Sequence, residues 1–167
     1  MRLAAVTASR RGETDLILSE LAGKLIRAGL RLAGVVQTNT DVPGRHHCEM
    51  DVRVLPDGPT ICISQNLGPA ARGCRLDPDG LERAVASVAL RLDGADLLIL
   101  NKFGKHEAEG RGFVPLIAEA LSRDIPVLLG VSDLNRAAFD AFTAGAATRL
   151  PAEQAAILDW AQARLPA

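Results

Sequence analysis

Several features are scarce in this sequence of 167 residues. Aromatic residues make up 3%, the formal net charge is −1, and no apolar run approaches the roughly 20 residues that a membrane-spanning helix needs. Because the net charge is close to zero, the chain as a whole does not attract nucleic acid or an anionic membrane, and we expect neither as a partner. Any anion-binding site must therefore be a local feature.

Cysteine is also scarce. Cys48, Cys62 and Cys74 are odd in number and form no C-x-x-C pair, a pattern that favours reduced thiols over a disulfide framework. Met1-Arg2 leads directly into an apolar segment and not into the charged, apolar and small-residue series of a signal peptide. We therefore expect a cytoplasmic protein.

Apolar residues are abundant, at 48%, and they form short blocks that alternate with helical patterns. The length fits one domain with a full core, residues 1–167. Uninterrupted apolar runs predict buried strands, and apolar residues three and four apart predict the helices between them. This alternation predicts a three-layer α/β domain with a mostly parallel sheet and flanking helices. The predicted strands are residues 3–6, 32–36, 95–100, 127–131 and 148–150, and the predicted helices lie near residues 18–26, 77–92, 113–121, 132–142 and 152–164.

One segment departs from this alternation. Between residues 50 and 63, apolar residues alternate with polar ones on both sides of the turn sequence at residues 55–58, which predicts an inserted β-hairpin. Matching the apolar faces of the hairpin places Val52 opposite Ile61. The same register puts Cys48 and Cys62 on opposite faces, so we do not expect them to share a metal ion.

Next to this hairpin, His46, His47 and Cys48 follow one another. Imidazole and thiolate groups suit zinc or copper. No standard ligand spacing supports such a site, however, and adjacent side chains on an extended chain point in opposite directions. We therefore expect no metal site.

The first predicted strand is followed by the loop Thr7–Thr14, which can be compared with the phosphate-binding pattern G-x-x-x-x-G-K-[ST]. The loop keeps the second glycine, Gly12, and the hydroxyl, Thr14. It has Thr7 in place of the first glycine and Glu13 in place of the lysine. A carboxylate at that position repels the phosphate that a lysine attracts. Two interpretations remain open: an anion site at a helix N-terminus, or an ordinary turn that Thr14 caps.

A second polar segment, Asn101–Gly112, follows the strongest predicted strand. It combines glycines with charges of both signs, which is typical of a ligand-contacting loop, although a solvated charged loop has the same composition. The carboxyl ends of parallel strands meet at one edge of a sheet, so we expect this segment to face Gly12 there. Lys102 and Lys105 would then supply the positive charge that Glu13 removes.

A third loop carries Arg72, Cys74 and Arg75 among glycines. Its arginines suit an oxyanion or a carboxylate of a protein partner. A surface turn with solvated arginines fits the same residues. Both interpretations stay open, and the sequence does not decide whether this loop reaches the other two.

Two of these segments carry a family resemblance. Residues 12–14, Gly-Glu-Thr, with the strands before and after them, resemble the opening of the P-loop nucleoside triphosphatase superfamily. Its small kinase-like members, and the GTP-binding accessory protein of molybdenum-cofactor nucleotide attachment, are the most similar. Residues 96–107, Asp-Leu-Leu-Ile-Leu-Asn-Lys-Phe-Gly-Lys-His-Glu, are similar to the Asp-Glu-Ile-Gly-Lys-Met-Glu segment of the thermophilic-type nucleoside triphosphatases.

Most of the chain also resembles an uncharacterised bacterial domain family that is often encoded near molybdate-transport genes. The shared motifs are Ile-Ser-Gln-x-x-Gly-Pro at residues 63–69, Arg-Gly-Cys-Arg-Leu at residues 72–76 and Asn-x-Phe-Gly-Lys-x-Glu-Ala-Glu-Gly-Arg-Gly at residues 101–112. The resemblance implies a P-loop-type fold and a setting in molybdenum or molybdate metabolism. It carries no activity, because that family has none assigned.

The triphosphatase resemblance implies a degenerate site. Asn101 stands where the superfamily has the Mg²⁺-linked aspartate, Lys102 where it has the glutamate that polarises water, and Glu13 where it has the lysine. Three altered roles at one predicted site argue against Mg²⁺-dependent hydrolysis by the standard route.

The working hypothesis is an accessory or sensor protein that binds a nucleotide, phosphate or tetrahedral oxyanion with little or no hydrolysis; Mg²⁺ would accompany a nucleotide. One alternative is an active nucleoside triphosphatase or nucleotide kinase that uses Lys102, Lys105 and Arg111, with Glu107 or Glu109 as the base. Another is a scaffold with a dead site that binds a protein partner. The candidate nucleotide- or anion-binding residues are Ser9, Arg10, Arg11, Gly12, Glu13, Thr14, Asn101, Lys102, Gly104, Lys105 and Arg111.

Overall fold

The computed structural model of the protein describes residues 1–41, 48–65 and 75–163. Within these residues the chain forms a seven-stranded sheet in the order β4-β3-β2-β5-β6-β1-β7. Strands β2, β5, β6, β1 and β7 run parallel, while β3 is antiparallel to β2 and β4 is antiparallel to β3. The strands are β1 (Leu3–Val6), β2 (Leu32–Asp41), β3 (Cys48–Val54), β4 (Thr60–Cys62), β5 (Leu97–Phe103), β6 (Val127–Val131) and β7 (Thr148–Leu150).

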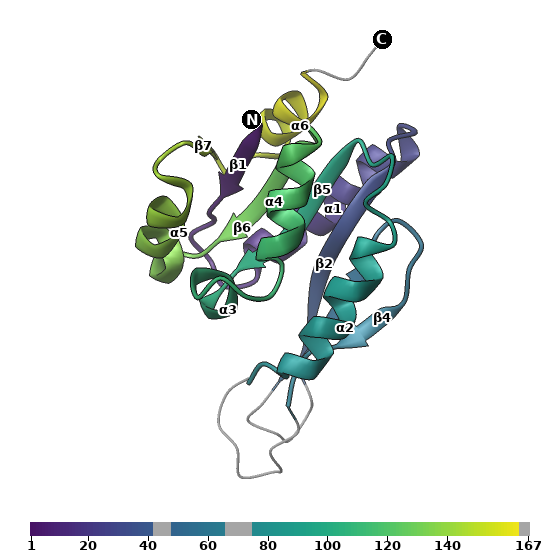
Figure 1. Ribbon diagram of the computed structural model, residues 1–167, viewed down its shortest axis with the longest axis vertical. Helices are drawn as coiled ribbons and strands as arrows, with labels where there is room; N and C mark the ends of the chain where they lie inside the picture. The colour runs from purple at the N-terminus through teal and green to yellow at the C-terminus, as the bar shows by residue number, and fades with distance from the viewer. Residues whose placement is uncertain (42–47, 66–74, 164–167) are drawn as a thin grey trace.

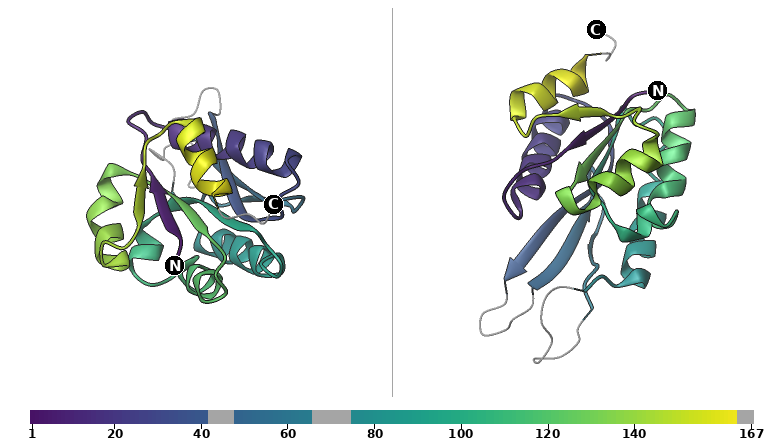
Figure 2. Two further views of the ribbon diagram at one scale, coloured as in Figure 1. Left: turned by 90° about the horizontal axis from the view of Figure 1, so that it is seen from above. Right: turned by 90° about the vertical axis from the view of Figure 1, so that its left-hand side faces the viewer.

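Helices cover both faces of this sheet (Figures 1 and 2). Helices α1 and α6 pack on one face, and α2, α4 and α5 pack on the other, so the core divides into two apolar clusters separated by the sheet. The three-layer α/β fold with a mostly parallel sheet is therefore confirmed. The helices are α1 (Glu13–Arg27), α2 (Pro78–Ala89), α3 (Lys105–Ala108), α4 (Val114–Ser122), α5 (Arg136–Thr143) and α6 (Gln154–Gln162), with a 3₁₀ turn η1 at Asp133–Asn135.

The central strands β5 and β6 are apolar without alternation because both of their faces are covered. Residues 97–100 of β5 and 127–129 of β6 are completely buried. Within the ladder of β2 and β5, Gly34 has φ of +118°, and a Cβ there would lie 1.8 Å from the carbonyl oxygen of Ile99. Only glycine fits at this position of β2.

The inserted hairpin is present, and its predicted register is confirmed. Val52 pairs with Ile61, and the Ile63 N–H donates to the Met50 carbonyl over 2.8 Å. The strand predicted to end at residue 36, however, continues to Asp41 and pairs antiparallel with β3 along its whole added length. That prediction was wrong because residues 37–41 are polar, and pairing with β3 rather than burial makes them a strand. The three strands β2, β3 and β4 extend past the rest of the sheet as an arm (Figure 2).

Other helix boundaries follow from local chemistry, with two corrections. Asp77 caps α2 by accepting the Asp79 N–H over 3.1 Å, as the Asp-Pro sequence predicts. Ser132 does not cap a helix with its side chain, and the 3₁₀ turn η1 lies between it and α5. The segment predicted as a loop after residue 100 holds the end of β5 and the short helix α3. In the part of the chain that the structure describes, no helix has both the length and the apolar character to span a bilayer.

Candidate anion-binding site

The loop after β1 and the end of β5 meet at the carboxyl edge of the sheet. They line a common cavity of about 490 Å³, together with the connection from β6 to η1. The loop contributes residues 8–12 and the start of α1, and β5 contributes Asn101 and Lys102. The structure thus brings together Ser9, Arg10, Arg11, Gly12, Thr14, Asn101 and Lys102, all of which the sequence suggests as site residues.

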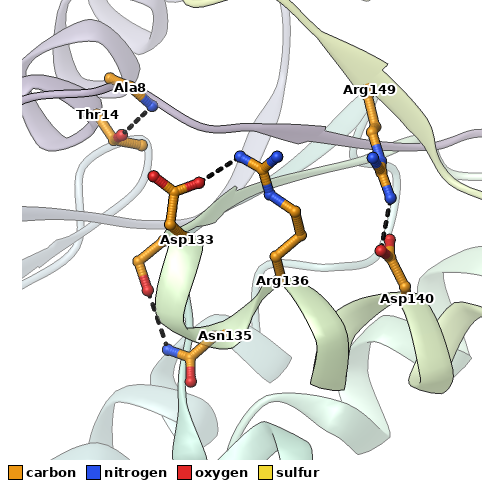
Figure 3. A network of polar contacts seen from close by, with 8 residues as sticks. Ala8, Thr14, Asp133, Asn135, Arg136, Asp140 and Arg149 are labelled. Carbon is orange, nitrogen blue, oxygen red and sulfur yellow. Dashed lines mark hydrogen bonds and ion pairs between the residues drawn. The ribbon is translucent and has the colours of Figure 1, made fainter.

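The β1–α1 loop is closed by its own side chains. Gly12 sits at the N-cap of α1 with φ of +77°, a left-handed conformation that suits glycine. The carboxylate of Glu13 accepts the Arg10 N–H over 3.2 Å, and the Thr14 hydroxyl accepts the Ala8 N–H over 3.2 Å (Figure 3). The two residues at the positions of the pattern's lysine and hydroxyl therefore bind the loop itself. Glu13 does not line the cavity.

Asn101 is the buried centre of the site. Its side chain is 3% exposed and joins three elements: Oδ1 accepts the backbone N–H of Gln37 over 2.9 Å, and Nδ2 donates to Asp15 Oδ1 over 2.9 Å and to Gln37 Oε1 over 3.2 Å. Both donors of the amide are used and its oxygen is engaged. Asn101 thus fastens β5 to β2 and to the first turn of α1.

Asp15 is the acidic member of this group. Burial raises the pKa of the Asp15 carboxyl above its ordinary value of 3.8, and the hydrogen bond from Asn101 and the positive charge of Lys102 only partly oppose that rise. A carboxyl group whose pKa is shifted by burial is typical of functional sites. Sequence analysis missed Asp15 and Gln37, since an acid in a first helical turn and a polar residue after an apolar run carry no special signal.

The cavity has an excess of accessible positive charge. Arg10, Arg11 and Lys102 line it and are exposed. Of the acidic groups that line it, Asp133 forms an ion pair with Arg136 (Figure 3), and Asp15 is bound by Asn101. Among the described residues, Arg10 and Arg11 make no ion pair, so their charge is available to a ligand.

The predicted second segment is built around Glu107. Its carboxylate is 4% exposed and accepts the backbone N–H of Gly104 over 3.0 Å and of Phe113 over 3.1 Å. At Gly112, with φ of +61°, a Cβ would lie 2.1 Å from Glu107 Oε1, so the turn closes onto the carboxylate only with glycine. Glu107 is occupied in shaping this segment and not placed to act as a base.

The other charges of this segment pair with each other at the surface. Lys105, with 84% of its side chain exposed, lies 3.9 Å from Glu109, and Arg111 also pairs with Glu109. The pairing with Arg111, and to a lesser extent the charges of Lys105 and His106, lower the pKa of Glu109. Gly104 and Lys105 line a neighbouring cavity, and Arg111 lines neither of the two.

Several predicted residues lie outside the described part of the chain, namely Arg72, Cys74, His46 and His47. Arg75 is exposed, and its carbonyl accepts the Gln65 N–H over 2.7 Å. Within residues 1–41, 48–65 and 75–163, no group of three or more His, Cys, Asp or Glu side chains could hold a metal ion.

Comparison with solved structures shows the fold. THEP1 from the hyperthermophile Aquifex aeolicus superposes with a TM-score of 0.63 at 14% identity, covering 95% of each chain. A human cancer-related nucleoside triphosphatase superposes with a TM-score of 0.53 at 20% identity, covering 79% of this chain and 76% of that one. The chain therefore shares the overall fold of these two proteins.

Sequence comparison identifies a curated relative. The molybdenum import ATP-binding protein ModC 2 of Bradyrhizobium diazoefficiens is 37% identical over 160 residues, which are 95% of this chain but 18% of the relative. This chain thus spans about a fifth of the length of that protein. Residues 3–160 match the model of the family described as "Protein of unknown function (DUF2478)". The chain belongs to the DUF2478 family.

Proposed function

We propose that this protein binds a small anion, either a tetrahedral oxyanion or the phosphates of a nucleotide, in the cavity at the β1–α1 loop. The observation that carries the proposal is the placing of Arg10, Arg11 and Lys102 around one cavity at the N-terminus of α1. A helix N-terminus contributes on the order of 0.3–1 kcal/mol toward an anion, and each arginine can add charge-assisted hydrogen bonds. The binding free energy would come mainly from the arginines.

Binding in this cavity proceeds with little or no hydrolysis. In the standard route a lysine neutralises the phosphates and a carboxylate holds Mg²⁺. Here the side chain at the lysine position, Glu13, carries the wrong charge and binds the loop amide of Arg10. Asn101, at the carboxylate position, donates its amide hydrogens to Asp15 and Gln37. The positions of the lysine and of the Mg²⁺-binding carboxylate in the standard route are thus held by other groups, which do not support phosphoryl transfer.

The proposed role is that of an accessory or sensor protein in molybdenum metabolism. Its support is that the molybdenum import ATP-binding protein ModC 2 of Bradyrhizobium diazoefficiens contains a segment 37% identical to this chain. A tetrahedral oxyanion such as molybdate has the charge and shape that arginines and a helix N-terminus accept.

A thermal-unfolding panel tests the proposal. The purified protein is melted with ATP, GTP, phosphate, sulfate, molybdate or tungstate, each with and without Mg²⁺. A ligand present at about 100 times its Kd adds about 2.7 kcal/mol to the free energy of unfolding, which is a clear rise in Tm. The proposal fails if none of these anions stabilises the protein.

A matched pair of variants locates the binding. Arg11→Ala should weaken the responding anion by about tenfold, which corresponds to about 1.4 kcal/mol. Arg83→Ala removes an exposed arginine from α2 and serves as the control, with no change expected. Chromatography of ATP and GTP incubated with the wild-type protein should show no nucleoside diphosphate above the background. Equal binding by both variants, or sustained turnover, would contradict the proposed site or its lack of hydrolysis, respectively.

A further inference from the structure

A second cavity of about 380 Å³ lies beside the first, between the sheet and the segment that carries α3. Gln37, Met50, Asn101 and Lys102 line both cavities. The hydrogen-bonded pair of Gln37 and Asn101 is buried and fixed, so it forms a wall between the two. Small-molecule sites typically have volumes of about 300–1,000 Å³, and this cavity falls within that range.

The floor of the second cavity is apolar, unlike that of the first. Val35, Val52, Ile63, Leu81 and Phe113 line it, and each is no more than 5% exposed overall. These side chains come from both β2–β3 and the helical layer, so the cavity lies where the arm of the sheet meets that layer. Buried apolar walls around an open volume favour the body of an organic molecule over water or a bare inorganic ion.

Polar groups are gathered toward one side of this cavity. Lys102, Lys105 and His106 line it, and Lys102 is exposed and shared with the anion cavity. Glu107 also lines it, but both carboxylate oxygens are bound by the backbone N–H groups of Gly104 and Phe113. Lys105 lies 3.9 Å from Glu109, whereas Lys102 makes no ion pair among the described residues, so the charge of Lys102 is the more available to a ligand.

We propose that the second cavity binds the apolar or aromatic body of a small organic anion whose charged group lies at Lys102. A pocket with an apolar floor and an exposed cation discriminates by both features, because neither the uncharged body nor the bare anion satisfies the whole site. The inference goes beyond the proposed anion function and does not require it. The apolar walls would hold an organic body whether or not the neighbouring cavity accepts an oxyanion.

Calorimetric titration with matched probes tests this proposal. The probes are 1-naphthyl phosphate, which has both an aromatic body and an anionic group, 1-naphthol, which lacks the anion, and inorganic phosphate, which lacks the body. The wild-type protein should bind 1-naphthyl phosphate with a saturable isotherm and at least about tenfold more tightly than 1-naphthol. Lys102→Ala should remove that difference.

Pocket-filling variants show which cavity is used. Leu76→Trp places a large side chain at a half-buried position of the second cavity and should weaken 1-naphthyl phosphate by about tenfold or more. Leu90→Trp, at a position 84% exposed just after α2, is the matched control and should change nothing. Leu76→Phe, a smaller enlargement at the same position, serves if Leu76→Trp does not fold, as circular dichroism would show.

The outcomes separate the two cavities. Loss of 1-naphthyl phosphate binding in the filling variants, with binding kept in Arg11→Ala, supports the second cavity even if inorganic phosphate fails to bind anywhere. The proposal is overturned if the wild-type protein shows no saturable binding of 1-naphthyl phosphate. It is equally overturned if folded filling variants bind as tightly as the wild type while Arg11→Ala does not, because the probe would then lie in the anion cavity.

Discussion

The two edges of the sheet differ in whether all of their arginines are paired. At the amino edge, just before β5, Asp96 accepts the Arg31 backbone N–H over 2.8 Å and pairs with its guanidinium over 3.0 Å. Arg123, after α4, similarly pairs with Glu119 over 2.5 Å and lies 3.6 Å from Asp93. At the carboxyl edge, by contrast, the charges of Arg10 and Arg11 form no ion pair among the described residues.

Two aspartates show the same contrast. The Arg31 side chain lowers the pKa of Asp96, and burial raises the pKa of Asp15. Charges at the amino edge therefore contribute to stability, whereas Asp15 lowers stability once it is ionised. Groups that lower the stability of the folded state are expected at binding sites. The comparison supports the proposal that the carboxyl edge is the binding edge, without reference to any relative.

The largest effect on stability is expected from removing the Glu107 carboxylate, which shapes the segment after β5 at the carboxyl edge. Glu107→Ala leaves the partly buried backbone N–H of Gly104 and the buried one of Phe113 without their acceptor. At about 1–3 kcal/mol for each unsatisfied group, the free energy of unfolding should fall by about 2–6 kcal/mol, measured by urea denaturation. Glu109→Ala, two residues further along the chain at the surface, should change it little. Equal effects of the two substitutions would show that Glu107 does not organise this segment.

A second substitution introduces an acid at residue 101, where the family resemblance would place one. Asn101→Asp removes two donated hydrogen bonds and sets a second carboxylate against Asp15 and Gln37 Oε1. The variant should be less stable by about 1–3 kcal/mol at neutral pH. Lowering the pH should reduce this loss, since one of the two carboxyl groups then takes up a proton. Denaturation at several pH values checks this.

The control for that experiment is Asn135→Asp, whose amide donates to the Ser132 hydroxyl over 3.3 Å. It should cost much less. If Asn101→Asp proved as stable as the wild type at every pH, the carboxyl edge would tolerate an acid at this position, and the degenerate character of the site would not depend on Asn101.

Sequence patterns predict the fold well where burial alone makes an element. The apolar run of β6 was predicted at its observed bounds, residues 127–131, because both of its faces are covered. The far half of β2 escaped prediction because its ladder with β3 depends on a partner strand and not on its own composition. Long-range pairing of polar residues leaves no periodic signal.

The site was predictable only in outline. The meeting of the β1 loop with β5 follows from parallel topology, so its position could be expected. The hydrogen bond between Asp15 and Asn101 joins residues 86 positions apart, and the sequence around either residue does not predict it. Similarly, Glu107 belongs to a charge-rich segment in which the sequence does not distinguish the one buried carboxylate from the solvated ones.

Opposite pH dependence is the third consequence of the comparison. Because the pKa of Asp96 is lowered from 3.8, its stabilising effect is present above that value and is lost as the pH falls through the lowered pKa. Asp96→Asn should thus cost about 1 kcal/mol or less at neutral pH, since solvent screens the pair, and nothing in strong acid. Asp15→Asn should behave in the other direction. The raised pKa of Asp15 means that the wild type loses stability as the pH rises from 3.8 through that pKa, so the variant gains relative to it.

Urea midpoints of both variants between pH 3 and pH 8 measure these slopes, with the wild type run in parallel. Slopes of the same sign for the two substitutions would remove the distinction between the edges.

The smallest effect is expected from Lys105, and it separates binding from catalysis. Its side chain is almost fully exposed, pairs only loosely with Glu109 and lies outside the anion cavity. Lys105→Ala should leave both stability and anion affinity nearly unchanged, because such a pair is screened by solvent. Lys102→Ala, which removes a cation that lines the cavity, should weaken the anion by about tenfold. A triphosphatase that used Lys105 to stabilise transferred charge would give the reverse order, with turnover that falls steeply in Lys105→Ala. Side-by-side titration and turnover assays of the two lysine variants therefore decide whether the charge of the second segment serves the ligand or only its own fold.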